Sequence, residues 1–260
     1  MSGPYRYPMV EAMSNSITAA VIIIGNEILS GRTKDENLGY MATKLAAMGI
    51  RLAEARVVAD KTEAIVEAVN ECRKRYTYVF TTGGIGPTHD DITARSVAAA
   101  LSLPVERNME AVHRLAPQYK PGDLNEARLS MADMPVGASL IDNPVSRAPG
   151  FQIENVFVLA GVPSIMRAMF DSLQNRLVGG APIRSKTVAC FLAEGTIAAD
   201  LSALQDRFPQ IDIGSYPFFR QGKFGTSLVL RGTDENLLGK AVEELRGIIR
   251  ALGAEPVEAG

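Results

Sequence analysis

Runs of hydrophobic residues alternate with segments of helical periodicity along the first part of the chain. Residues 17–24 are rich in β-branched side chains and end at Gly25, which predicts a buried strand. In residues 35–48 the apolar side chains return at helical spacing, which predicts a helix. The same order recurs twice, with strands predicted at 52–58 and 78–82 and helices predicted at 62–75 and from Asp90 or Asp91 to Leu101.

Short connections join these alternating elements. They predict a mostly parallel sheet covered by helices, the doubly wound α/β arrangement. Ligands of such sheets bind beyond the carboxyl ends of the strands. Gly25, Asp60 and Gly83 each follow a predicted strand, so we expect them to lie at one edge of the sheet.

The pattern changes in the second half of the chain. Residues 108–150 are less regular, with short helices predicted at 110–115 and 124–131, and a strand at 155–159 and a helix at 163–173 follow. A Val-Gly-Gly-Ala-Pro break at 178–182 precedes strands predicted at 186–192, 211–215 and 226–231 and helices predicted at 197–208 and 235–252. We therefore expect a flexible lead-in at 1–16, a main domain at 17–178 and a smaller α+β domain at 183–260.

Between two of these later strands, residues 216–225 predict a hairpin loop that contains Phe218, Phe219, Arg220 and Lys223. These side chains indicate either an aromatic packing turn or a contact with the ligand or a second subunit.

Composition argues against nucleic-acid binding, a membrane span and a zinc site. A formal net charge of −2 gives no basic excess for nucleic-acid binding. The longest apolar run, 17–24, is too short to span a bilayer, so we expect no membrane partner. Two cysteines far apart in sequence, Cys72 and Cys190, predict buried reduced thiols and a cytoplasmic protein. The low number of histidines, two in the whole chain, argues against a His/Cys zinc site.

The segment Gly83-Gly84-Ile85-Gly86 carries the strongest chemical signal. Three glycines in four positions permit positive φ angles, and successive backbone N–H groups then form a concavity that binds phosphate. A helix beginning near Asp90 would add the positive end of its dipole. The loop lacks both the Gly-Lys-Ser/Thr ending of a P-loop and GxGxxG spacing. A tight turn without a ligand is the alternative.

Asp90 and Asp91 follow this loop directly. Two carboxylates beside a phosphate repel it unless a divalent cation such as Mg²⁺ lies between them. Asp90 is alternatively a helix cap. Asp60, at the end of the second predicted strand, either faces the same crevice or is a structural residue of the turn.

The loop belongs to a longer motif, Thr82-Gly83-Gly84-x-Gly86-Pro87-Thr88-x-Asp90-Asp91-x-Thr93, and further motifs lie in order at 25–31, 57–60, 143–151 and 161–164. Together these motifs resemble the MoaB/Mog family of molybdopterin-binding proteins, and most closely the amino-terminal region of CinA proteins. The resemblance is strong over residues 17–173 and only general beyond.

The resemblance implies a three-layer α/β/α fold with a mostly parallel sheet, followed by a second, smaller α+β domain. It further implies catalysis by Asp60 and Asp91, with Asp90 and Asp91 as metal ligands. The ligand would be a phosphorylated small molecule, including molybdopterin, and the assembly a homo-oligomeric dimer or trimer. The implied ligand-binding residues are Gly83, Gly84, Gly86, Pro87, Thr88, Glu27, Asn37 and Asn143.

The sequence also departs from the family pattern. His89 stands where lysine is common, and Ile165 stands where a glutamate is common. The chain ends at Gly260 without the deamidase domain that CinA proteins commonly carry, so we expect no deamidase activity from this polypeptide.

Three functions remain open at this stage. The first is a metal-dependent pyrophosphatase acting on ADP-ribose-type substrates. The second is a non-catalytic molybdopterin-binding protein or a molybdopterin adenylyltransferase. The third is a regulatory or scaffolding protein without a ligand.

Overall fold

The computed structural model describes residues 17–120, 122–220 and 222–258. The chain forms two compact units, one running to Leu45 and from Ile50 to Gly180, the other comprising Ala46–Gly49 and Ala181–Gly260. The expected lead-in, residues 1–16, lies outside the described residues. None of the described helices is both long enough and apolar enough to cross a membrane.

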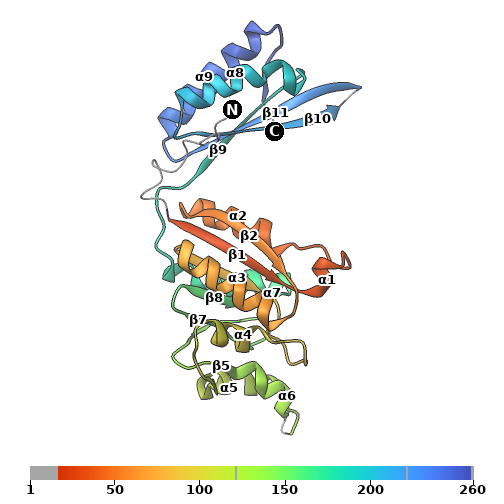
Figure 1. Cartoon of the computed structure of the whole chain (residues 1–260), viewed down its shortest axis with the longest axis vertical. Helices are drawn as coiled ribbons and strands as arrows, with labels where there is room; N and C mark the ends of the chain where they lie inside the picture. The colour runs from red at the N-terminus through yellow and green to blue at the C-terminus, as the bar shows by residue number, and fades with distance from the viewer. Residues whose placement is uncertain (1–16, 121, 221, 259–260) are drawn as a thin grey trace, which may run out of the picture. The chain divides into compact units, whose positions relative to one another are not determined.

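The first unit is built on a six-stranded sheet with the order β2-β1-β3-β8-β7-β6. Its strands β2, β1, β8 and β7 are labelled in Figure 1. Strands β2, β1, β3 and β8 run parallel, and β7 and β6 add antiparallel pairs at one side. The fold is therefore the mostly parallel sheet that the alternating pattern predicted. The strands are β1 (Thr18–Ile24), β2 (Arg51–Val58), β3 (Tyr78–Thr82), β6 (Ser139–Ile141), β7 (Gly150–Ile153) and β8 (Val156–Leu159).

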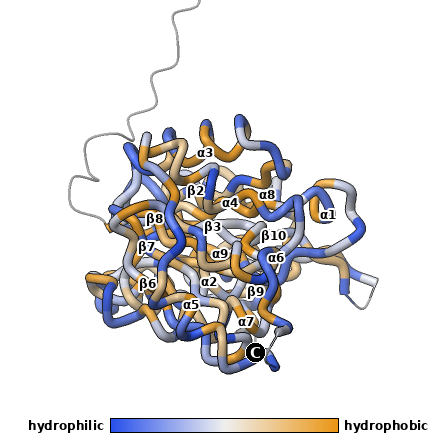
Figure 2. The backbone as a smooth tube through the Cα atoms, turned by 90° about the horizontal axis from the view of Figure 1, so that it is seen from below, coloured by the Kyte–Doolittle hydropathy of each residue, from blue (hydrophilic) through white to orange (hydrophobic). Residues whose placement is uncertain are grey.

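Helices α3 (Thr62–Arg75) and α4 (Thr93–Ala100) cover one face of this sheet. Hydrophilic and hydrophobic turns alternate along α3 in Figure 2, because one face of the helix is buried and the other meets water. A core cluster on this face joins buried residues of β1, α3 and α4, among them Ala20, Ile22, Ile24, Ile65, Val69 and Val97.

Helices α2 (Asn37–Ala47) and α7 (Pro163–Leu173) pack by aromatic contacts over the opposite face. The Phe80 ring of β3 lies 5.2 Å from the ring of Phe157 in β8 and 5.5 Å from that of Phe170 in α7, centroid to centroid. The Phe170 ring also contacts Tyr40 of α2. Since side chains alternate along a strand, Thr82 points to the same face as Phe80, and Thr81 to the other.

The middle of the chain holds strands that the sequence pattern did not indicate. Strand β4 (Val105–Arg107) pairs with β5 (Asp133–Pro135), and β6 and β7 join the main sheet. Each has only three or four residues, too few to show a periodicity. The short helices of this region are α5 (Met109–Leu115), η1 (Ala116–Gln118), α6 (Glu126–Leu129) and η2 (Ser130–Ala132), while α1 (Asn26–Leu29) follows β1 and η3 (Gln174–Arg176) follows α7.

The second unit has a four-stranded antiparallel sheet with the order β10-β11-β9-β12. Helices α8 (Glu194–Arg207) and α9 (Glu235–Ala251) bury their apolar residues with it in a separate core. The strands are β9 (Arg184–Cys190), β10 (Asp212–Arg220), β11 (Lys223–Gly232) and β12 (Val257–Glu258).

The hairpin predicted at 216–225 is confirmed, but the extent of its loop is wrong, because β10 and β11 stay paired from Asp212↔Arg231 to Arg220↔Lys223. Its aromatic residues pack together: the Phe219 ring lies 4.8 Å from the ring of Phe224, and the Phe218 ring 5.8 Å from that of Phe191. Cross-strand aromatic pairs stabilise a ribbon, so residues that looked like a loop extend the strands.

Candidate functional site

The order of the parallel strands creates a topological switch point. From β1 the chain first continues to β2 on one side of β1 and then returns to β3 on the other side. Ile23 of β1 is in register with Thr82 of β3, so the two strands end side by side. Open α/β sheets bind ligands beyond the strand ends at such a point.

The turn after β1 is held by the end of β2. The Gly25 amide donates to the Val58 carbonyl at 3.2 Å, and the Asn26 amide donates to Oδ2 of Asp60 at 2.7 Å. One carboxylate oxygen of Asp60 therefore fixes the start of α1. Asp60 lies at the predicted edge of the sheet, with a backbone amide of the chain as its partner.

Gly83 and Gly84 adopt positive φ angles of 101° and 66°, as the glycine loop predicted. A Cβ at Gly83 would lie 2.2 Å from the Ile24 carbonyl oxygen, and one at Gly84 would lie 2.3 Å from Thr93 Oγ1. The Gly83 amide donates to the Leu159 carbonyl at 3.2 Å, so it is not available to a phosphate. The expectation that Gly83 donates to a ligand is corrected on this ground.

The next three amides, those of Gly84, Ile85 and Gly86, have no protein acceptor within the described part of the chain. Their residues line a small cavity, here called the loop cavity, together with Asp91 and Asp133. Asp133 is paired with Arg107 at 2.9 Å, whereas the Asp91 carboxylate lies against Gly86. The other lining residues are Ala94, Ser130, Met131, Pro149 and Phe151.

Thr88 holds both aspartates of the motif. Its amide donates to Asp91 Oδ2 at 2.8 Å, and its hydroxyl oxygen lies 2.5 Å from the same atom and 2.6 Å from Asp90 Oδ1. The hydrogen bond from Thr88 lowers the pKa of Asp90. Because a hydroxyl donates one proton at a time, one of the two carboxylates keeps a free lone pair there. The Thr88 amide is occupied and does not extend the open cradle.

Helix α4 begins at Thr93, later than the predicted start at Asp90 or Asp91. Its N-cap position is Ile92, which has no side-chain cap, so the interpretation of Asp90 as a cap is wrong. The reason is that both aspartate side chains turn back to Thr88. The Thr93 amide donates to the Gly84 carbonyl at 3.0 Å, which removes it from any ligand.

The residues fit a cation only in part. Among the described residues, no group of three or more His, Cys, Asp or Glu side chains is arranged to hold a metal ion. Asp90 and Asp91 nevertheless both lie within hydrogen-bond distance of one hydroxyl, that of Thr88. Mg²⁺ is often held by one or two carboxylates, with substrate phosphate and water completing its shell.

A second cavity, here called the switch-point pocket, lies at the ends of β1 and β3. Asn37 of α2 lines it, and its Nδ2 donates to the Gly161 carbonyl at 2.8 Å. Asn37 is 4% exposed and Thr82 is 1% exposed, yet Asn37 Oδ1 and Thr82 Oγ1 have no hydrogen-bond partner among the described residues. The pocket is lined by Ile23, Ile24, Glu27, Ile28, Thr33, Lys34, Asp35, Glu36, Asn37, Thr82, Gly161 and Pro163.

Two of the predicted residues, Glu27 and Asn37, therefore lie in the switch-point pocket. Thr82 was not predicted as a site residue. Its signal in the sequence was the pair Thr81-Thr82, two hydroxyls at the end of a strand whose preceding residues are apolar. Pro87 and His89 are exposed beside the glycine loop.

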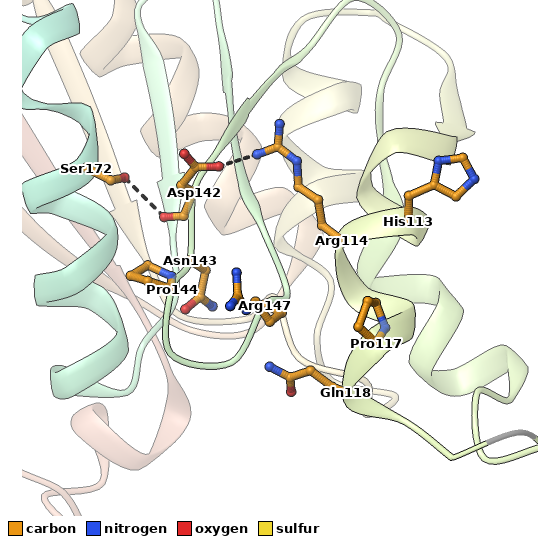
Figure 3. A pocket seen from close by; sticks show the side chains of 9 residues that line it. All are labelled: His113, Arg114, Pro117, Gln118, Asp142, Asn143, Pro144, Arg147 and Ser172. Atoms are coloured by element: carbon orange, nitrogen blue, oxygen red, sulfur yellow. Dashed lines mark hydrogen bonds and ion pairs between the residues drawn. The ribbon is translucent and has the colours of Figure 1, made fainter.

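Asn143 lies in neither of these cavities. Its Oδ1 accepts from the amides of Val145 and Ser146, and its Nδ2 donates to the Ala148 carbonyl. It lines a different cavity, shown in Figure 3, with Arg114 and Arg147 nearby. The expectation that Asn143 lines the same crevice as the glycine loop is corrected, because its side-chain amide forms hydrogen bonds within its own turn.

Neither the loop cavity nor the switch-point pocket is lined by both Asp60 and Asp91. Of these two residues, Asp91 lines the loop cavity, and neither lines the switch-point pocket. Their proposed joint role in catalysis is thus not supported by a common cavity.

Comparison with known families gives two matches along the chain. Residues 20–178 match the family model described as a probable molybdopterin binding domain. Residues 182–257 match the model described as the middle domain of FAD synthase. The two matches follow the two compact units.

Individual relatives agree with this division. A protein of Archaeoglobus fulgidus is 32% identical over 230 residues, covering 88% of this chain and 96% of the relative. A probable FAD synthase of Caenorhabditis elegans is 31% identical over 278 residues, covering 96% of this chain but 52% of the relative. The crystal structure of a CinA protein of unknown function from Thermoplasma acidophilum matches with a TM-score of 0.60 and 32% identity, covering 63% of this chain and 99% of that one.

The family match covers more than half of the chain, and the structure of the first unit has the sheet, the glycine loop and the strand-end motifs expected from it. The chain belongs to the family of proteins with a probable molybdopterin-binding domain of the MoaB/Mog type, and its first unit is CinA-like.

Proposed function

We propose that the first unit binds a phosphorylated small molecule and, with a divalent cation, hydrolyses the phosphoanhydride of ADP-ribose-type substrates. The observation that carries this proposal is the run of three amides, Gly84 to Gly86, which have no acceptor among the described residues and which line the loop cavity together with Asp91. Three successive N–H donors are a common cradle for phosphate oxygens.

The negative charge of the neighbouring carboxylates is the reason why the proposal includes a divalent cation. Asp91 beside the open amides would repel a phosphate, and Asp90 lies against the same Thr88 hydroxyl. Mg²⁺ or another divalent cation, held by Asp90 and Asp91, would offset this repulsion and polarise the bridging phosphate. Asp60 is left out of this pair because its Oδ2 is engaged by the Asn26 amide.

The residues of the chain have two tasks in this reaction. The amides of Gly84 to Gly86 stabilise negative charge that develops on the phosphate oxygens. Thr88 keeps both carboxylates in place through its amide and its hydroxyl. Such preorganised donors require no rearrangement during the reaction.

The test is hydrolysis of ADP-ribose with Mg²⁺ or Mn²⁺, followed by chromatography of AMP. We expect AMP from the wild-type protein and a rate lower by about 100-fold or more in Asp91→Asn, which keeps the shape but loses the charge. Asp212→Asn is the matched control, because Asp212 is exposed on β10 in the second unit. An absence of AMP with every metal would contradict hydrolysis.

A second candidate function is binding of molybdopterin without turnover, or adenylyl transfer to it. The match to a probable molybdopterin-binding domain favours this candidate, and the relative named as a probable FAD synthase favours a ligand with an adenylyl group. For pure binding, pterin fluorescence titration would give the same affinity for Asp91→Asn and the wild type. Adenylyl transfer would instead give a pyrophosphate product from ATP.

A further inference from the structure

The switch-point pocket contains two buried polar atoms, Asn37 Oδ1 and Thr82 Oγ1, that find no partner in the part of the chain that the structure describes. Buried side-chain oxygens in folded proteins are nearly always hydrogen-bonded, and an unmade bond costs stability. Two such atoms in one pocket at the switch point of the sheet therefore indicate a group that completes them.

The orientation of the Asn37 amide is fixed by its neighbour. Nδ2 donates to the Gly161 carbonyl at 2.8 Å, and a carbonyl can only accept, so the free atom must be the oxygen. Asn37 Oδ1 is thus an acceptor. Thr82 shares the face of Phe80, which packs toward α7 by contact with Phe170, and the ring of Phe170 meets Tyr40 of α2.

The charges of the lining residues disfavour a phosphate in this pocket. Its lining includes Glu27, Asp35 and Glu36 but a single cationic side chain, Lys34. The missing partner must be a hydrogen-bond donor, since Asn37 Oδ1 only accepts.

We infer that the switch-point pocket receives an N–H or O–H donor of the bound ligand, hydrogen-bonded to Asn37 Oδ1 and Thr82 Oγ1. This inference rests on the proposed function, in which the phosphate lies on the amides of Gly84 to Gly86. Thr82 and Gly84 are two positions apart, a reach of roughly 7 Å along the backbone. The donor is either an amino or ring N–H of the heterocycle or a hydroxyl of the sugar.

Thr82→Val is the decisive variant, because valine keeps the shape of threonine and removes the hydroxyl. Calorimetry with AMP and Mg²⁺ should show affinity weakened by about 10-fold, while the thermal midpoint without ligand stays the same or rises. Thr82→Ser keeps the hydroxyl and should bind AMP like the wild type.

Thr81→Val is the matched control. Thr81 is also fully buried and its Oγ1 also lacks a partner, but it points to the other face of the sheet and does not line the pocket. We expect Thr81→Val to bind AMP like the wild type. Equal affinities of Thr82→Val and wild type, or an equal loss in Thr81→Val, would overturn the inference.

Ligand analogues identify the donor. Weaker wild-type binding of IMP, which lacks the amino group of AMP, assigns the donor to the ring. Weaker binding of 2′-deoxy-AMP or 3′-deoxy-AMP assigns it to the sugar. If all three analogues bind as tightly as AMP, or if an ordered water bridges the two oxygens with AMP bound, the inference is wrong.

Inorganic pyrophosphate separates this inference from the proposed function. It has phosphate oxygens but no ring or sugar, so it should bind Thr82→Val and wild type equally. If pyrophosphate binds but Thr82→Val leaves the affinity for AMP unchanged, the inference about the pocket is wrong, and the proposed phosphate site at Gly84 to Gly86 is retained. Binding of neither pyrophosphate nor AMP by the wild type would overturn both.

Discussion

Gly83 and Gly39 show how differently one residue type acts in this protein. Gly83 has φ 101°, and a Cβ there would lie 2.2 Å from the Ile24 carbonyl oxygen. We expect Gly83→Ala to lower the free energy of unfolding by about 2–3 kcal/mol, because the strained backbone and the backbone clash add. Gly39 lies in α2 with nothing within 4 Å of a Cβ, so Gly39→Ala should raise it by about 0.5–1 kcal/mol.

Urea denaturation followed by circular dichroism measures both changes. The pair is matched, since each variant adds one methyl group to a glycine of the first unit. The two variants should change the free energy of unfolding in opposite directions. A Gly83→Ala protein as stable as the wild type would mean that β1 and β3 do not approach as closely as described.

At the scale of elements, Glu54 ties β2 to the residue that follows α3. It accepts a hydrogen bond from the Tyr76 hydroxyl and pairs with Arg56. The Tyr76 hydrogen bond, and then that of Arg56, lower the pKa of Glu54 from its ordinary value of 4.5. A carboxyl with a lowered folded pKa stabilises the protein fully above its unfolded pKa, and this stabilisation is lost as the pH falls through the folded pKa.

We therefore expect Tyr76→Phe to lower the free energy of unfolding by about 1 kcal/mol at neutral pH, and by less below pH 4.5, where the wild type itself loses the contribution. Thermal melts at several pH values give the comparison. Tyr119→Phe is the control, because Tyr119 contacts Arg128 through its ring. A pH-independent difference for Tyr76→Phe would argue against the role of Glu54.

At the scale of the whole molecule, the two units are joined by an exposed segment. Residues 178–182 have no helix or strand, and Val178 is 72% exposed. Exposed segments without secondary structure are preferred sites of proteolysis. Within the described residues, we expect brief digestion by elastase to cut first in this segment, which mass spectrometry would show as one fragment from each side of it.

The hairpin turn between β10 and β11 serves as the internal comparison, because its strands are hydrogen-bonded on both sides of it. Earlier cleavage there than at 178–182 would contradict the description of the joining segment. Retention of both fragments after longer digestion is expected, since each unit has its own buried core.

The sequence by itself determined the elements that carry a local signal. Helix α3 and strand β3 were predicted with their observed bounds, and the glycine loop was placed at a strand end with its positive φ angles. Periodicity and glycine content are properties of adjacent residues, so no distant contact is needed to read them. The break at 178–182 is local for the same reason.

Only the tertiary structure decided which of the site residues meet. The bond from Gly83 to Leu159, the late start of α4 and the engagement of Asp60 by Asn26 depend on segments far apart in the sequence. The lack of a partner for the oxygens of Asn37 and Thr82 likewise becomes visible only in the folded chain, where residues of α2 and β3 line one pocket. Whether a polar group has a partner is a property of the packed chain, because the partner comes from another element.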